Sequence, residues 1–86
     1  MTRFLSQSEL QGILMHRKVV GNLLEKISEE PKIELPMLFS FVAKESNVPL
    51  ITAGMIYHGI CMDGLIDYDE SGTKILTEKG RKFISY

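Results

Sequence analysis

Apolar residues recur every three or four positions through the first third of the chain, which is the period of one face of an α-helix. Ser6 and Glu9 precede this stripe at the three-residue spacing of a helix-capping box. The pattern predicts one long helix over residues 7–29, which Glu30-Pro31 ends. The alternative is a break near Gly21, because glycine costs a helix interior up to ~1 kcal/mol. The stripe comprises Leu10, Ile13, Leu14, Val20, Leu23, Leu24 and Ile27 and is interrupted at Arg17.

The period changes after this helix. Ile33 and Leu35 alternate with polar neighbours, which predicts a short strand. Pro36 fits the first turn of a second helix, where its missing N–H costs nothing. That helix ends at Ser46-Asn47. We expect its buried face to consist of Leu38, Phe39 and Val42.

A third helix starts at Pro49 and ends at Gly64, since glycine readily adopts the conformation that closes a helix. Its predicted buried stripe is Ala53, Ile56, Tyr57 and Ile60. Two strands follow, over 65–68 and 74–76, and we expect them to pair antiparallel. Asp69-Glu70-Ser71-Gly72 supplies the turn between them. Thr77 is a good N-cap for a last helix that extends to Tyr86.

Three short motifs stand in a fixed order along the second half of the chain. They are Asn47-Val48-Pro49, Gly64-Leu65-Ile66 and Leu76-Thr77-Glu78-Lys79-Gly80. In this order the chain resembles the winged helix-turn-helix regulators of the MarR and PadR type, over roughly residues 33–83. There the motifs form the turn between two helices, the entry to the wing and the exit from it.

The resemblance implies an α+β fold, a compact winged helix. Its order would be helix, short strand, helix, helix, two-stranded wing and C-terminal helix. Residues 1–86 would form one domain, with the winged-helix core at 33–83. The helix at 7–29 would be the dimerisation element of a homodimer. The ligand that the resemblance implies is double-stranded DNA.

The residues at the reading positions depart from this family. Basic and polar side chains on its recognition helix reach phosphates and base edges. The corresponding outward positions here carry no fixed positive charge: Leu50, Ile51, Gly54, Met55 and His58. The wing tip holds three acids, Asp67, Asp69 and Glu70. Phosphate contacts dominate nucleic-acid affinity, so acids at this position repel DNA.

Two functions from different classes follow. In the first, a DNA-binding transcriptional regulator of bacterial, archaeal or viral origin reads DNA through its third helix. Leu50, Ile51 and Met55 would make van der Waals contacts, Lys44, Thr52 and His58 polar ones, and Lys74, Lys79, Arg81 and Lys82 would hold the phosphate backbone.

In the second, the winged helix binds another protein through an exposed apolar patch at Leu50, Ile51 and Met55. The competing structural explanation is a rotated helix that buries these three side chains in the core. The family resemblance favours the first function and the residues favour the second. We take DNA binding as the expectation to test.

Composition narrows the setting of either function. Ten basic and eleven acidic residues give a net charge of −1, so no global basic excess indicates nucleic acid. The one cysteine, Cys61, cannot form an internal disulfide, which suits a reducing compartment. No apolar run approaches the ~20 residues of a membrane span, and the first residues are too polar for a signal peptide. A cytoplasmic protein without membrane contact is expected.

The candidate chemistry is sparse. His58, Cys61 and Asp63 lie on one predicted helix, but a metal site needs three or four converging ligands and the only other histidine is His16. No nucleophile–base pair or paired carboxylates suggest catalysis. We therefore expect no enzyme, no metal and no cofactor. Tyr57 is expected to pack its ring and expose its hydroxyl to water.

Overall fold

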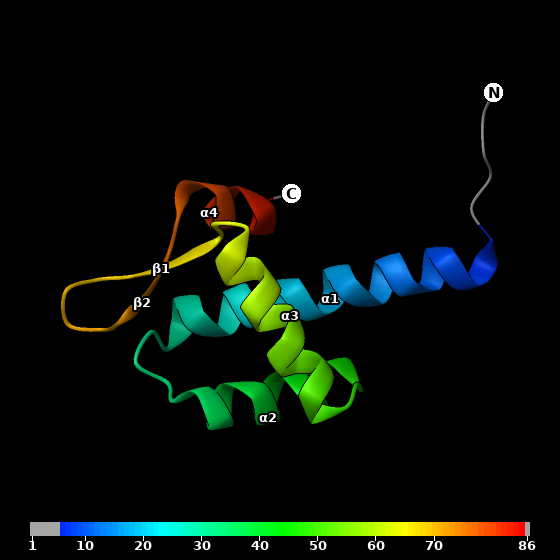
Figure 1. The fold of residues 1–86 in the computed structure, drawn as a ribbon, viewed down its shortest axis with the longest axis horizontal. Coiled ribbons are helices and arrows are strands. Elements are labelled where there is room, and N and C mark those ends of the chain that lie inside the picture. The colour runs from blue at the N-terminus through cyan, green and yellow to red at the C-terminus, as the bar shows by residue number, and fades with distance from the viewer. Residues whose placement is uncertain (1–5, 86) are drawn as a thin grey trace.

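The computed structural model describes residues 6–85, which contain four helices and one antiparallel hairpin (Figure 1). The predicted α+β class is confirmed. The helices are α1 (Gln7–Glu29), α2 (Leu35–Ser46), α3 (Leu50–Met62) and α4 (Glu78–Ile84), and the strands are β1 (Ile66–Tyr68) and β2 (Lys74–Leu76).

α1 has the predicted bounds and continues through Gly21. The Ser6 side chain caps it by accepting a hydrogen bond from the Glu9 N–H at 3.1 Å. The helix has two different halves. Residues 7–18 are exposed and extend beyond the rest of the fold, whereas the C-terminal half lies among the other elements (Figure 1).

The core forms around this C-terminal half of α1, which packs against α2, α3, α4 and β2. The predicted inner faces of α2 and α3 are confirmed in most positions. Phe39 and Ile56 are only half-buried against the core. The buried apolar side chains are Val19, Val20, Leu23, Leu24, Ile27, Leu38, Val42, Ala53, Tyr57, Ile60, Leu65 and Ile66.

The strand predicted at Ile33 to Leu35 is wrong. Leu35 is the first residue of α2, with Pro36 in its first turn, and residues 30–34 form a loop. Ile33 is apolar because its side chain packs against the core. The carbonyls of Pro31 and Ile33 accept hydrogen bonds from the Lys74 ammonium instead of from a neighbouring strand.

The turn between α2 and α3 depends on Asn47, whose φ of 55° is left-handed. Asparagine tolerates this conformation better than most residues. Its N–H closes α2 by donating to the carbonyls of Ala43 and Lys44. The predicted end of α2 at Ser46 and start of α3 after Pro49 are therefore confirmed.

The hairpin has the predicted antiparallel pairing, with Ile66 opposite Leu76 and Tyr68 opposite Lys74. Its turn is held by one carboxylate. Asp69 accepts hydrogen bonds from the backbone N–H groups of Ser71 and Thr73, at 2.9 and 3.0 Å, and from the Ser71 hydroxyl.

α4 is tied back to the end of α3 by its N-cap. The Thr77 hydroxyl accepts a hydrogen bond from the Gly80 N–H and donates one to the Gly64 carbonyl. This contact brings Gly80 against the backbone, because a Cβ placed there would lie 2.2 Å from the Leu65 carbonyl oxygen. Only glycine fits, which gives a physical reason for the glycine in the Leu-Thr-x-x-Gly motif.

Replacing Gly80 with alanine should therefore destabilise the fold, by at least the ~1–3 kcal/mol typical of overpacking. The matched control is Gly59→Ala in α3, where an added Cβ meets no atom within 4 Å. That change should leave stability unchanged or raise it by up to ~1 kcal/mol. Urea denaturation measures both. Equal stabilities of the two variants would contradict the close approach at Leu65.

Candidate interaction surface on the third helix

The outer face of α3 is apolar and exposed. Leu50 is 55% exposed, Ile51 71% and Met55 68%. The alternative in which a rotated helix buries these side chains is therefore wrong. The opposite side of α3, made by Ala53, Tyr57 and Ile60, faces the core.

The exposed side chains border a groove of about 600 Å³, which we call the α3 groove. Phe39 of α2 contributes to its lining, and an added Cβ at Gly54 would lie 3.5 Å from the Phe39 ring. The sequence predicts Phe39 as a core residue. The packing of α2 against α3 shows that its ring contacts the core and also lines the groove. The lining consists of Phe39, Leu50, Ile51, Gly54, Met55 and His58.

The predicted polar contacts around this groove are few. His58 is exposed and lines the groove, and Thr52 is half-buried on the same helix. Lys44 is exposed near the end of α2. The groove lining itself contains no lysine, arginine or carboxylate. Van der Waals contact and water exclusion are therefore the main interactions that it offers.

Lys74 does not belong to a basic patch. The residue is only 7% exposed, and its ammonium donates hydrogen bonds to the Ile33 and Pro31 carbonyls. Burial and these hydrogen bonds argue against the predicted phosphate contact at Lys74. The Lys74 side chain is buried because it contacts the loop at residues 30–34, some forty residues earlier in the chain. The sequence around Lys74 does not reveal this contact.

The other predicted phosphate contacts lie on α4 and point to different places. Arg81 donates to the Leu76 carbonyl at 2.8 Å, and Lys82 forms an ion pair with Glu78 at 3.3 Å. Lys79 donates to the carbonyl of Asp63, the C-cap of α3, at 3.0 Å. Lys79 therefore lies near the opposite end of α3 from Leu50, about 20 Å along the helix axis at 1.5 Å per residue.

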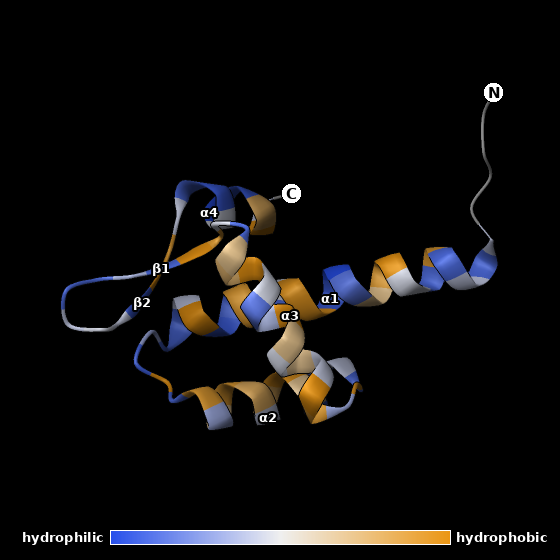
Figure 2. Ribbon diagram, viewed as in Figure 1, coloured by the Kyte–Doolittle hydropathy of each residue, from blue (hydrophilic) through white to orange (hydrophobic). Residues whose placement is uncertain are grey.

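Lys79 and Lys82 instead share a hollow of about 430 Å³ with His16 and Arg17 of α1 and with one acid, Asp63. We call this group the α1–α4 basic cluster. The sequence indicates Arg17 together with the cations of α4 as a basic patch, but not His16, and the two halves lie some sixty residues apart in the chain. Figure 2 shows the difference between the two regions: α4 begins in the hydrophilic colour, while α3 is mostly pale to orange.

The hairpin adds negative charge rather than positive. Asp67, Asp69 and Glu70 are all exposed. The Ser71 hydroxyl, followed by the Thr73 N–H, lowers the pKa of Asp69 below its usual value. Asp69 is therefore ionised at neutral pH. A polyanion approaching the hairpin would meet repulsion.

On the buried side of α3, the Tyr57 side chain connects this helix to β1. The Tyr57 ring packs against Phe39 with centroids 5.3 Å apart, as predicted, but its hydroxyl hydrogen-bonds to the Tyr68 hydroxyl instead of being left to water. Burial, and then the hydrogen bond to Tyr68, raise the pKa of Tyr57 above its usual value. Burial also raises the pKa of the half-buried Cys61 thiol, so this cysteine is a poor nucleophile at neutral pH.

Within residues 6–85, no group of three or more His, Cys, Asp and Glu side chains is placed to hold a metal ion. His58, Cys61 and Asp63 thus do not converge with further ligands in the described part of the chain.

None of the described helices combines the length and apolar character that crossing a bilayer requires. Comparison of the chain with protein-family models, curated proteins and solved structures finds no match.

The raised pKa of Tyr57 predicts a loss of stability in alkali. Below pH ~10, the pKa of tyrosine in the unfolded chain, the Tyr57 hydroxyl is protonated in both the folded and the unfolded state. Its full contribution to the free energy of unfolding is then present. Above that pH the unfolded chain releases the proton while the folded chain retains it, so stability falls as pH rises. Thermal unfolding midpoints from about pH 8 to 11 should fall less steeply for Tyr57→Phe than for wild type.

Tyr68→Phe is the matched control. It removes the hydrogen bond but not the burial, which is the larger cause, so most of the alkaline slope should remain. Superimposable slopes for wild type and Tyr57→Phe would show that Tyr57 titrates normally.

Proposed function

We propose that the protein is a winged-helix domain that binds a partner protein through the α3 groove. The observation that carries this proposal is the groove itself: three large apolar side chains are more than half exposed around a lining without any fixed charge. Contiguous exposed apolar surface of this kind marks interaction sites.

The winged-helix assignment rests on the order and packing of the elements. α2 and α3 contact each other across a short turn, and α3 leads directly into the antiparallel hairpin. α4 then returns to contact α1. This is the element order of the regulators that the sequence resembles, without the short strand before α2.

The ligand that suits the groove is an amphipathic helix of the partner. The lining residues of α3 run from Leu50 to His58, which is slightly more than two helical turns and about 12 Å. A partner helix would place apolar side chains one turn apart between Ile51 and Met55, above Phe39. This is the helix-in-groove mode, in which burial supplies the affinity.

DNA binding remains as a second candidate because of one observation, the α1–α4 basic cluster. Arg17, Lys79 and Lys82 converge there with His16 around one hollow, which Asp63 also lines. In this case the phosphate contacts come from α1 and α4, with Lys79 near the C-terminal end of α3. The apolar face of α3 would then lie outside the DNA contact, and the acids of the hairpin would repel the phosphates.

A photo-reactive amino acid at Met55 tests the two candidates together. Irradiated in a lysate of the source cell, it should form a discrete protein adduct. The adduct should disappear when Ile51→Asp is added, because a charge in a dehydrated apolar interface is costly. Both side chains are exposed, so the changes should leave the fold intact.

Two controls make the result specific. The same reagent at Met62, which is 76% exposed on α3 but outside the groove lining, should give no such adduct. Lys79→Ala with Lys82→Ala should leave the adduct at position 55 unchanged. Nucleic acid cross-linked at position 55, or loss of binding in the lysine variant alone, would refute protein docking at α3.

The proposed assembly is a homodimer, through a smaller part of α1 than the sequence predicted. Leu23, Leu24 and Ile27 belong to the core of the same chain and cannot form an interface. Residues 7–18, which we call the α1 arm, are exposed and carry an apolar stripe of Leu10, Ile13 and Leu14. Isolated helices of this length are marginal in water, so packing against a second arm would stabilise it.

Ile13→Glu should therefore convert a dimer into a monomer. Met15→Glu is the matched control, since it introduces the same charge two residues later and about 200° around the helix. Sedimentation velocity at tens of micromolar distinguishes the states. A wild-type protein that sediments as a monomer at this concentration would refute the dimer.

A further inference from the structure

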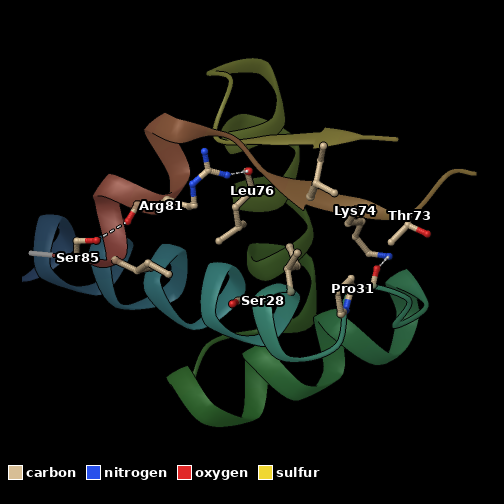
Figure 3. Close-up of a pocket in the computed structure, with 10 residues that line it drawn as sticks. Ser28, Pro31, Thr73, Lys74, Leu76, Arg81 and Ser85 are labelled. Atoms are coloured by element: carbon tan, nitrogen blue, oxygen red, sulfur yellow. Dashed lines mark hydrogen bonds between the residues drawn. The ribbon is translucent and has the colours of Figure 1, made fainter. Parts of the chain in front are cut away.

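A third hollow, of about 560 Å³, runs along β2 on a different part of the molecule. β2 and α4 form one side and the C-terminal part of α1 forms the other (Figure 3). Ile27, Leu76 and Ile84 give it apolar walls. Its charged lining residues are Lys74 and Arg81, and because the Lys74 ammonium is bound to the Pro31 and Ile33 carbonyls, Arg81 is the cation that faces a ligand. We call this hollow the β2 trough.

The pairing pattern of the hairpin determines which backbone groups face this trough. The backbone N–H of Thr77 donates to the Leu65 carbonyl, and the backbone N–H of Asp69 donates to the Thr73 carbonyl. These two bonds mark hydrogen-bonded residue pairs just beyond each end of the β1–β2 ladder. Hydrogen-bonded and non-hydrogen-bonded pairs alternate in antiparallel sheets. Ile75 therefore directs its backbone groups toward β1, while those of Lys74 and Leu76 point away from it.

Most of these outward groups have no partner. The Leu76 carbonyl accepts from Arg81, but the N–H groups of Lys74 and Leu76 and the Lys74 carbonyl make no hydrogen bond to any residue within 6–85. Within the same range, no strand pairs with β2 on this side, because the sheet contains two strands only, and α1 forms the opposite wall of the trough. An open strand edge of this kind is a template for pairing with another chain.

We propose that the β2 edge binds an extended, acidic segment of a partner protein by strand addition. The unpaired N–H and C=O groups select an extended backbone, because alternate residues of the added strand would pair with Lys74 and Leu76. Three residues of β2 span about 10 Å, which four or five residues of the ligand would cover.

The side chains of the trough define the chemistry of that segment. Its side chains would point alternately to the two faces of the sheet, so those on one face would pack between Ile27, Leu76 and Ile84. A flanking carboxylate would lie near Arg81, whose guanidinium uses one donor on Leu76 and keeps others for the ligand. Figure 3 shows Arg81 at one end of the trough and Lys74, turned toward Pro31, at the other. This site does not depend on the α3 groove.

Two synthetic peptides test the proposal on the intact protein: Ac-Glu-Val-Thr-Val-Glu-NH2 and its counterpart with lysine in place of both glutamates. In NMR titrations the acidic peptide should shift the amide signals of Lys74 and Leu76 saturably. It should also slow their hydrogen exchange. The lysine peptide should bind at least tenfold more weakly.

Backbone pairing predicts a further result that simple charge attraction does not. N-methylation of the acidic peptide at both valines or at the central threonine blocks opposite edges of the ligand strand. Only one of the two methylated peptides should lose binding. Arg81→Gln should weaken the acidic peptide several-fold, whereas Lys82→Gln, one residue further on α4, should not.

Several outcomes would overturn strand addition at β2. These are absence of saturable shifts at millimolar peptide, equal binding of both methylated peptides, and shifts centred on Leu50 and Met55. Concentration-dependent protection of the Lys74 and Leu76 amides without peptide would show that a second copy covers the edge. That result would also overturn the proposal.

Discussion

The buried face of α1 is the constraint on which the other elements depend. Val19, Leu23 and Ile27 are almost completely removed from water, and α2, α3, α4 and β2 all pack against this one helix. Each of those elements is too short to bury its apolar face alone. Because α3 turns Ala53, Tyr57 and Ile60 toward α1, its remaining apolar residues have no place in the core. The exposed α3 groove follows directly from this packing.

Much of the fold was predictable because its signals are local. The helix bounds follow from caps and periodicity at Ser6, Asn47 and Thr77, and the hairpin follows from its turn residues. The wrong predictions concern contacts between distant segments. Alternation at Ile33 resembled a strand, but the Lys74 side chain holds that loop in place of a neighbouring strand. Whether Leu50 and Ile51 were core or surface could not be decided before the position of α1 was known.

Charge and apolar surface are distributed unevenly over the molecule. Acids gather on the hairpin, exposed cations gather where α1 meets α4, and the apolar groove contains neither sign. A helix that reads DNA needs cations beside it. Here the cations and the outward face of α3 are separated, which favours burial of apolar surface as the source of affinity. The β2 trough, with Arg81 and an open strand edge, offers a different kind of contact to a different ligand.

The most direct test of the central claim is binding of random-sequence duplex DNA to the wild-type protein across a salt series beginning near 20 mM. If α3 binds protein, affinity should be negligible even at low salt, since no cation lines the groove and the hairpin repels phosphate. The contradictory result has two parts. Log affinity would fall linearly with log salt, showing several phosphate contacts, and Met55→Asp would abolish that binding. Together they would show that α3 faces DNA.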